Sequence, residues 1–243
     1  MPLLETVGIS VRFGGNVAVD DVHLDIQEGA ITGLIGPNGA GKTTLFNCVT
    51  GMQRPASGRI VLDNKDITRH SPGRRARMGM ARTFQRLELF LSLSVRDNLT
   101  VAGDIVRSNH RKKINVRQEV DRVLKLTGLE DVADLDVSDI PTGRARVVEV
   151  ARALMTHPRL LLLDEPASGQ TEKETEHFAE LLLGLAKDGL AVCLVEHDLP
   201  LVMRLSSMIH VLDQGRRIAS GTPAEIRQDQ GVIDAYIGKE AVE

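Results

Sequence analysis

A glycine-rich segment between an apolar run and an amphipathic stretch is the feature that most constrains this chain. Residues 36–43 have the sequence Gly-Pro-Asn-Gly-Ala-Gly-Lys-Thr, which matches the pattern G-x-x-x-x-G-K-[ST]. The apolar run, Ile31 to Ile35, is a predicted strand, and the stretch from Thr44 to Val49 is a predicted helix. In this order, glycine backbone N–H groups and the helix N-terminus can surround an anion. The pattern predicts a loop that binds the phosphates of a nucleoside triphosphate.

Two side chains at the end of this loop have the chemistry that a bound triphosphate needs. We expect the Lys42 amine to reach the β- and γ-phosphates and the Thr43 hydroxyl to hold Mg²⁺. The alternative, a glycine turn followed by a chance Lys-Thr pair, is disfavoured by the flanking strand and helix. The remaining contacts to the nucleotide are expected from Asn38, Gly39, Ala40, Gly41 and Thr44.

The composition is that of a water-soluble protein with an aliphatic core. With 243 residues, of which 42% are hydrophobic, the chain can bury a core as one large domain or two small lobes. The net charge of −3 argues against an electrostatic footprint for nucleic acid, so we expect no nucleic-acid partner. The N-terminus lacks an apolar signal region, and no apolar run approaches the ~20 residues that span a bilayer. Cys48 and Cys193 are predicted to be small buried residues in a reducing cytoplasm, not a disulfide or a metal site.

The order of predicted elements indicates an α/β fold. Apolar strands separated by helical segments are typical of a parallel sheet that is covered on both faces. The middle of the chain differs, because Val95–Leu129 is charged and has helical spacing, and we expect a helical insert at about residues 87–158. The basic cluster from Arg107 to Lys113 is interpreted as a solvated helix face or loop. The other predicted strands are Leu4–Val11, Ala18–Ile26, Ile60–Leu62, Leu160–Leu163 and Ala191–Val195.

Three polar residues follow two of these strands, where ligand groups gather in parallel sheets. Asp164 ends the run of four leucines and can bind Mg²⁺ through water, opposite Thr43. Glu165 is suited to orient or deprotonate a water that attacks the γ-phosphate. His197 follows Ala191–Val195 and is placed to contact the γ-phosphate. The structural alternatives are two carboxylates that cap a strand end and a histidine that only hydrogen-bonds there.

With these residues in place, the chain resembles the ATPase subunits of ABC transporters over nearly all of its length. The resemblance rests also on Arg82-Thr83-Phe84-Gln85, on residues 140–144 leading into 150–154, and on residues 167–170. It implies an α/β fold: a P-loop NTPase (RecA-like) core with a parallel sheet, an antiparallel β subdomain and a helical subdomain. Residues 1–243 then form one ABC ATPase domain. Its core lobe would comprise residues 1–86 and 159–243, and its helical subdomain residues 87–158.

The resemblance also implies roles for residues that the phosphate loop does not explain. Phe13 stands where the family has an aromatic that stacks on adenine, and Gln85 where a glutamine contacts Mg²⁺ and the attacking water. Thr142, Gly143 and Arg144 match the signature loop, which binds the γ-phosphate of ATP held by a second subunit.

Three residues depart from the family pattern. Pro141 replaces the signature serine, Arg144 replaces a glutamine, and Thr171 stands where the interface loop has Asp or Asn. Pro141 is compatible with the first turn of a helix, because the N–H that proline lacks would have no partner within the helix there. Arg144 is expected to pair either with phosphate or with a neighbouring carboxylate. ATP binding should be intact because none of these departures touches the phosphate loop, and hydrolysis is the step that they would weaken.

The partners follow from the same resemblance. We expect ATP and Mg²⁺ as ligands, a second ATPase subunit that is identical or a paralogue, and transmembrane permease subunits. Docking is expected in the groove near Gln85 and residues 87–99. A solute-binding protein outside the membrane would act indirectly, and the chain would lie in the cytoplasm, on the inner face of the plasma membrane.

The cargo prediction rests on four shorter stretches that are similar to ATPases of branched-chain amino-acid uptake. They are residues 82–85, 195–203, 220–226 and 235–238. Transporters of lipids, urea or amides are the alternatives, as is a nucleotide-sensing regulatory subunit with weak hydrolysis. A GTP switch is disfavoured because Asn64-Lys65-Asp66-Ile67 fails the pattern Asn-Lys-x-Asp. Soluble ABC proteins of DNA repair or the ribosome usually carry two cassettes or long insertions.

Overall fold

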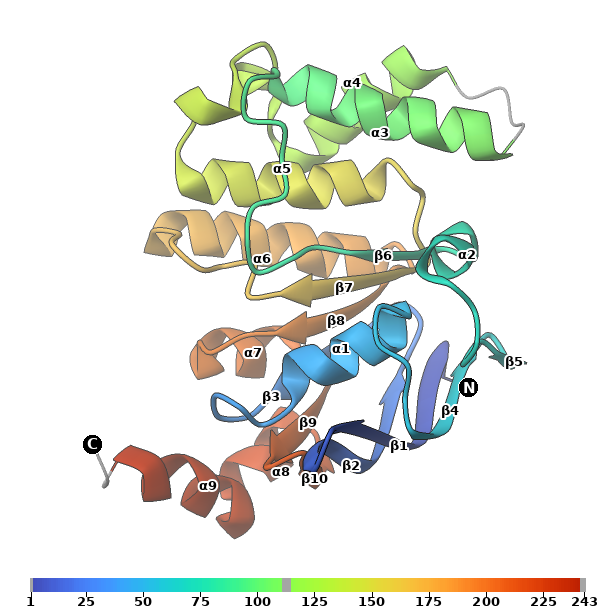
Figure 1. Cartoon of the computed structure of the whole chain (residues 1–243). Coiled ribbons are helices and arrows are strands. Elements are labelled where there is room, and N and C mark those ends of the chain that lie inside the picture. The colour runs from blue at the N-terminus through green and yellow to red at the C-terminus, as the bar shows by residue number, and fades with distance from the viewer. Residues whose placement is uncertain (1, 111–114, 241–243) are drawn as a thin grey trace.

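A six-stranded sheet runs through the middle of the computed structural model, which describes residues 2–110 and 115–240 (Figure 1). Its strand order is β10-β9-β3-β8-β7-β6, with β10 antiparallel to β9 and the other neighbours parallel. The predicted parallel sheet is confirmed. The strands are β3 (Ile31–Ile35), β6 (Met80–Arg82), β7 (Leu160–Asp164), β8 (Ala191–Val195), β9 (Met208–Asp213) and β10 (Arg216–Gly221).

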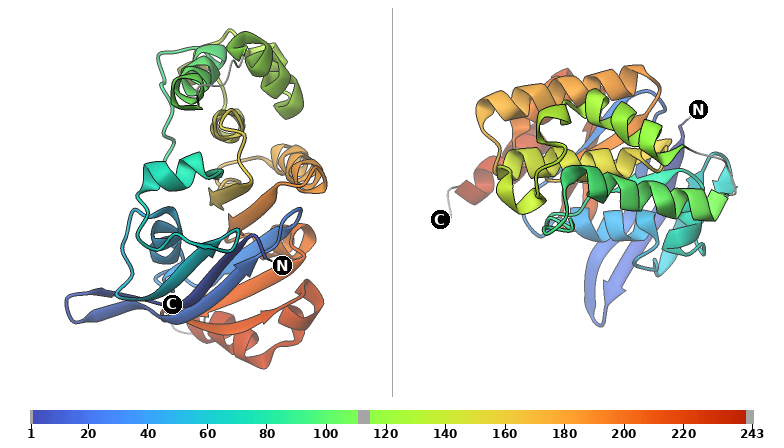
Figure 2. Two further views of the ribbon diagram at one scale, coloured as in Figure 1. Left: turned by 90° about the vertical axis from the view of Figure 1, so that its right-hand side faces the viewer. Right: turned by 90° about the horizontal axis from the view of Figure 1, so that it is seen from above.

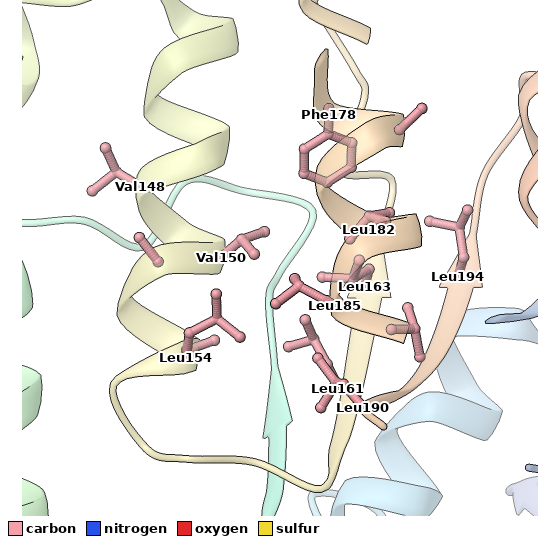
Figure 3. Close-up of a cluster of buried hydrophobic side chains, with 14 of the residues drawn as sticks. Val148, Val150, Leu154, Leu161, Leu163, Phe178, Leu182, Leu185, Leu190 and Leu194 are labelled. Carbon is pink, nitrogen blue, oxygen red and sulfur yellow. The ribbon is translucent and has the colours of Figure 1, made fainter. Parts of the chain in front are cut away.

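The central strands are largely apolar because both faces of the sheet are covered. On β7, Leu161 and Leu163 pack in one hydrophobic cluster, whereas Leu160 and Leu162 pack in another. The first cluster contains helix α5 (Thr142–Leu154) and helix α6 (Glu172–Lys187), whose side chains interlock with those of β7 and β8 (Figure 3). The second cluster contains helix α1 (Lys42–Thr50) and a second sheet. Alternate side chains therefore enter different cores, which explains the unbroken leucine run.

The second sheet is antiparallel and, in the described part of the chain, has four strands in the order β2-β1-β4-β5. β1 and β2 extend beyond their predicted ends because their ladder continues to the pair Phe13↔Asn16, on either side of the Gly14-Gly15 turn. This hairpin protrudes from the molecule (Figure 2, left). The strands are β1 (Leu4–Phe13), β2 (Asn16–Ile26), β4 (Ser57–Leu62) and β5 (Lys65–Asp66).

A layer of helices covers α6 on the side away from the sheet (Figures 1 and 2). Helices α3, α4 and α5 contact one another, and α5 also contacts α6. These helices lie within the predicted insert, residues 87–158. The layer contains α3 (Val95–His110), α4 (Val116–Thr127), the 3-10 turns η1 (Glu130–Val132) and η2 (Val137–Asp139), and α5. The remaining helices are α2 (Pro72–Arg77), α7 (Leu199–Leu205), α8 (Pro223–Gln228) and α9 (Gln230–Glu240).

Several further predictions can be compared with this structure. Cys48 and Cys193 are both buried and free, as expected, and burial raises the pKa of Cys48 to about 11. Arg107, in the basic cluster, pairs with Asp104 on α3, whereas residues 111–113 lie outside the described residues. Within the described ranges, no helix is both long and apolar enough to cross a bilayer.

Candidate functional site

Three neighbouring strands bring the predicted site residues to one edge of the sheet. β8 lies between β3 and β7. The glycine-rich loop follows β3, Glu165 follows β7, and His197 lies two residues after β8. Because parallel strands present their carboxyl ends at the same edge, residues from distant parts of the sequence meet there.

The glycine-rich loop has a shape that glycine alone fits at two points. Gly36 has a φ of 153°, and a Cβ atom there would lie 2.1 Å from the Leu212 carbonyl oxygen. Gly41 has a φ of 100°, and its Cβ would lie 2.6 Å from the Ala18 carbonyl oxygen. The loop is also held by the turn between β9 and β10, where the Gly215 N–H donates to the Ala40 carbonyl at 3.0 Å. Neighbouring strands therefore fix the loop against the sheet.

The start of α1 is equipped to hold an anion. Gly41 is the N-cap of α1 and offers no side-chain cap, so the amide groups of the first turn keep their capacity to bind a ligand. The side chain of Lys42 is buried and lies against the loop, where Nζ donates to the carbonyls of Gly36 at 2.6 Å and Pro37 at 3.0 Å. A cation and a helix N-terminus thus converge on the same small loop.

A polar cavity of about 560 Å³ opens over this loop. Every phosphate-loop residue predicted to bind the nucleotide lines it, as do Gln85 and Glu165. Other lining residues were not predicted, because they come from the β1–β2 hairpin and the β9–β10 turn and carry no motif. They are Asn16, Val17, Ala18, Gln214 and Gly215.

Glu165 is held on both carboxylate oxygens. His197 Nε2 donates to Oε1 at 2.8 Å, and Gln85 Nε2 donates to Oε2 at 3.0 Å. The backbone of Glu165 has a φ of 51°, in the left-handed region, and its N–H donates to the Val195 carbonyl at 2.9 Å. Such a conformation in a non-glycine residue is costly and is often found at functional positions. The three residues predicted to be catalytic therefore form one hydrogen-bonded group beside the cavity.

Asp164 has a partner that the sequence did not suggest. Its Oδ2 accepts a hydrogen bond from Arg82 Nη2 at 2.8 Å, and both side chains are buried. Arg82 Nη1 also donates to Asn47 Oδ1 at 2.6 Å, and the guanidinium lies over the rings of Phe46 and Phe84. Asp164 does not line the cavity, unlike Thr43 and Gln85. Of the three candidate magnesium ligands, two therefore face the cavity and one lies behind it.

A second buried carboxylate supports the loop after β7. Glu196 Oε1 accepts a hydrogen bond from the Ala167 N–H at 2.7 Å, and Oε2 accepts one from the His197 N–H at 3.2 Å. Burial raises the pKa of Glu196 above the ordinary value, although these two hydrogen bonds oppose the shift. Glu196 thus ties together the segments that carry Glu165 and His197.

The residues of the signature-like loop lie elsewhere. Thr142, Gly143 and Arg144 start α5 in the helical layer, and none of them lines the cavity. Arg144 pairs with Asp131, which is the neighbouring-carboxylate alternative of the two predicted for it. Thr171, at the predicted interface loop, is the N-cap of α6 and forms a capping box with Glu174.

Phe13 also lies outside the cavity. It ends β1 at the protruding hairpin, and 52% of its surface is exposed, so it is not a core residue. Its neighbour across the turn, Asn16, does line the cavity. The hairpin therefore places an exposed aromatic ring near the cavity.

The residues present fit a magnesium nucleotide. In the described part of the chain, no three His, Cys, Asp or Glu side chains are grouped so that they could hold a metal ion. Mg²⁺ in nucleotide sites is held by few protein ligands and by the phosphates themselves, so a hydroxyl, an amide and a nearby carboxylate are sufficient. The uncapped start of α1 and Lys42 offer matching partners for phosphate.

Comparison with protein families and curated proteins gives two kinds of match, to family models and to individual relatives. A model described as ABC transporter matches residues 19–168, and one described as branched-chain amino acid ATP-binding cassette transporter matches residues 216–242. The high-affinity branched-chain amino acid transport ATP-binding protein LivG of Escherichia coli (strain K12) is 40% identical over 98% of each chain. BraF of Pseudomonas aeruginosa, which has the same description, is 39% identical over 98% of each chain. Ribose import ATP-binding protein RbsA 1 of Rhizobium etli is 35% identical over 98% of this chain and 47% of its own length.

Solved structures share the fold. An ATP-binding cassette of an ABC transporter in its ADP conformation superposes with a TM-score of 0.87 at 31% identity, covering 98% of this chain and 99% of that one. A dimeric cassette with bound ADP and Pi has a TM-score of 0.80 at 23% identity, covering 90% and 98%, and shows likeness of fold alone.

Proposed function

This chain belongs to the ABC transporter family and is an ATP-binding, ATP-hydrolysing subunit of such a transporter, and we propose that the transporter takes up branched-chain or related amino acids. The support for the cargo is the match of residues 216–242 to the branched-chain model, together with the full-length similarity to LivG and BraF. The similarity to a ribose import protein extends over the same cassette, so the cassette alone does not define a cargo.

We infer that ATP is hydrolysed between two subunits. The cavity of one subunit provides the phosphate loop and Glu165, whereas the Thr142-Gly143 turn of the same subunit lies away from it. A second copy, or a paralogue, would bring its own turn to the γ-phosphate and complete the site. Hydrolysis would remove the γ-phosphate contacts and release the pair, as in other switches that are ordered by a γ-phosphate. Cassettes of this fold have been solved as dimers, one of them with ADP and Pi.

Within each site, we assign the binding roles to the phosphate loop. The Lys42 amine and the first-turn amides of α1 would bind the β- and γ-phosphates. Thr43, Gln85 and Asp164 would hold Mg²⁺, which would neutralise developing phosphate charge. Phe13 at the hairpin would stack on adenine.

The observation that carries the catalytic proposal is that both carboxylate oxygens of Glu165 accept hydrogen bonds from neighbouring side chains. A carboxylate held at 2.8 Å by His197 and at 3.0 Å by Gln85 is oriented towards the cavity that it lines. Glu165 would accept a proton from the attacking water, and one of its two partners would give way to that water. If His197 is the partner that gives way, it would be free to face the γ-phosphate, whereas Gln85 would keep its hydrogen bond to Glu165.

We propose that permease subunits dock in an apolar groove of about 520 Å³. The groove lies between the core and the helical layer, close to the predicted docking region, residues 87–99. Met52, Phe90 and Ile105 line it and expose 57%, 49% and 55% of their surfaces. Exposed apolar side chains grouped in a groove are typical of a site for an apolar helix. Docking there would hold this subunit on the cytoplasmic face of the membrane.

Uptake of radiolabelled leucine, isoleucine and valine tests the cargo. Cells that lack this chain should lose uptake, the wild-type chain should restore it, and Lys42→Ala should not, because the phosphate loop would lose its cation. Uptake of urea and of short amides in the same cells is the control. Loss of urea or amide uptake with normal leucine uptake would contradict the amino-acid proposal while leaving the ATPase assignment in place.

A further inference from the structure

Helix α5 starts with the turn that we assign to the partner's ATP and, one helical turn later, contacts the backbone beside Gln85. Arg146, four residues after Thr142, is buried. Its Nη2 donates to the Gln85 carbonyl at 2.6 Å, and its Nη1 donates to the Phe84 carbonyl at 3.1 Å. A guanidinium is a planar fork, so two hydrogen bonds to successive carbonyls fix their position in a way that one donor cannot.

The next turn of α5 holds the other end of the same loop. Glu149 is 4% exposed and pairs with Arg146 at 3.0 Å. Its Oε1 accepts a hydrogen bond from the Glu88 N–H at 2.9 Å. Residues 84–88 are thus fastened to α5 at both ends. Buried ion pairs add little net stability compared with apolar packing, so this pair is better explained by what it holds in place.

The chain of contacts continues into the catalytic group. The side chain of Gln85 donates to Glu165 Oε2 at 3.0 Å. The helix itself is anchored on two sides, because Val150 and Leu154 point towards α6 and β7, whereas the buried Val148 points to the opposite side of α5 (Figure 3). A displacement at the start of α5 would therefore reach the backbone of Gln85 within about one helical turn.

From this geometry we propose that the Arg146–Glu149 pair is a positioning device that makes the catalytic glutamate of one ATP site sensitive to the occupancy of the other. The inference rests on the proposed dimer, in which the Thr142-Gly143 turn binds ATP held by the partner. That ATP would fix α5, Arg146 and Glu149 would fix residues 84–88, and Gln85 would then hold Glu165 for the ATP in its own site. In a homodimer each subunit provides the same path, so each ATP site would act on the catalytic group of the other.

Substitutions of the pair test this coupling in the purified full chain. Arg146→Gln removes the two-pronged contact, and Arg146→Lys keeps the charge but not the fork. Both should leave the Kd for ATP, measured by calorimetry, close to wild type, because the phosphate loop is untouched. We expect kcat to fall about tenfold to a hundredfold through misplacement of Gln85. The Hill coefficient of ATP turnover, which for two coupled sites lies above 1 and at most at about 2, should fall towards 1. Glu149→Gln keeps an acceptor for Glu88 and should show a smaller loss.

Arg122→Gln is the matched control. Arg122 also pairs with a glutamate three residues away on a helix of the same layer, at 2.6 Å from Glu119, but it is 52% exposed. This variant should keep the wild-type kcat and Hill coefficient. The thermal midpoint of each variant separates a loss of folding from a loss of positioning, because a stability defect lowers the active fraction without changing the Hill coefficient. If Arg146→Gln does not fold, the kcat and Hill coefficient of Arg146→Lys and Glu149→Gln test the positioning role instead.

Two outcomes separate this inference from the proposed function. If Glu165→Gln forms an ATP-dependent dimer on gel filtration but folded Arg146 variants keep the wild-type kcat and Hill coefficient, the positioning role is wrong and the dimer stands. If Glu165→Gln stays monomeric at saturating ATP, the dimer is wrong and the inference is overturned with it.

Discussion

At the scale of single residues, Glu165 provides the most direct test of the chemistry. Glu165→Gln keeps the size of the side chain and one of its two acceptor oxygens, but the other oxygen becomes a donating NH2 group and the amide cannot accept a proton. We expect ATP binding to persist and kcat to fall by about two to four orders of magnitude. Steady-state phosphate release measures the loss, and gel filtration with ATP should show an accumulated dimer.

Glu130→Gln is the control for the same chemical change. Glu130 starts the 3-10 turn η1 in the helical layer and is exposed. Its substitution should leave phosphate release unchanged. Undiminished turnover in Glu165→Gln would remove Glu165 from the role of general base.

The sequence could predict several of the residues that line the cavity but not how they pair. Motif spacing identified Lys42, Asp164 and Glu165, because these residues belong to short local patterns next to apolar strands. The contacts that organise them join distant residues: Arg82 and Asp164 are 82 positions apart, and Gln85 and Glu165 are 80 apart. Such pairs depend on which strands become neighbours in the sheet, which no local pattern records.

At the scale of elements, His210 joins the two sheets and should make their contact sensitive to acid. It lies on β9, is fully buried, and contacts the Asp25 carbonyl of β2 through Nε2 at 3.1 Å. A carbonyl only accepts, so Nε2 carries the proton and Nδ1 accepts from the Ser220 hydroxyl, 2.9 Å away. Burial lowers the pKa of His210 below its usual 6.5; nearby Arg217 adds to this shift, and the Asp25 carboxylate opposes it.

The sign of the pH effect follows from this depressed pKa. Between the folded and unfolded pKa values, the unfolded chain binds more protons, so the free energy of unfolding rises with pH. We expect His210 to contribute stability above pH ~6.5 that is lost as the pH falls through the folded pKa. His210→Gln keeps a donor and an acceptor but does not titrate. The variant should therefore have a lower free energy of unfolding than the wild type at neutral pH, and this difference should become smaller at acidic pH. Urea unfolding between neutral and acidic pH measures the difference.

His23→Gln controls for the loss of a histidine on β2, because its side chain is 48% exposed. The difference in free energy of unfolding between His23→Gln and the wild type should not become smaller in acid, as the difference for His210→Gln is expected to do. A deficit for His210→Gln that stays constant from neutral to acidic pH would show that burial of this ring does not control the response.

The more apolar a strand is, the more clearly the sequence predicts it. β3, β7 and β8 are buried on both faces, and their apolar runs mark them clearly. β9 and β10 were not predicted, because His210 interrupts the apolar run of β9, Asp213 ends it, and β10 is largely exposed. Polar residues in these strands serve contacts with the second sheet and with solvent, and those contacts arise only once the sheets have packed.

At the scale of the whole molecule, the groove that we propose for permease docking shares no lining residue with the nucleotide cavity, so docking and ATP binding can be tested separately. Ile105 lies on α3, lines the groove and is 55% exposed, and it does not line the nucleotide cavity. Ile105→Glu would place a charge where we expect an apolar helix of the permease. Burying an unpaired polar group costs about 1–3 kcal/mol, so docking should weaken by about tenfold to a hundredfold.

Ile218→Glu makes the same substitution at a matched place outside the groove. Ile218 lies on β10 and is 41% exposed. Membranes that contain the permease subunits should retain the wild-type chain and Ile218→Glu, and should lose Ile105→Glu on washing. Both variants should bind ATP with the wild-type Kd, because neither position lines the nucleotide cavity. Equal retention of both on the membrane would place the permease contact on another face, since a charge within an apolar contact has to weaken it.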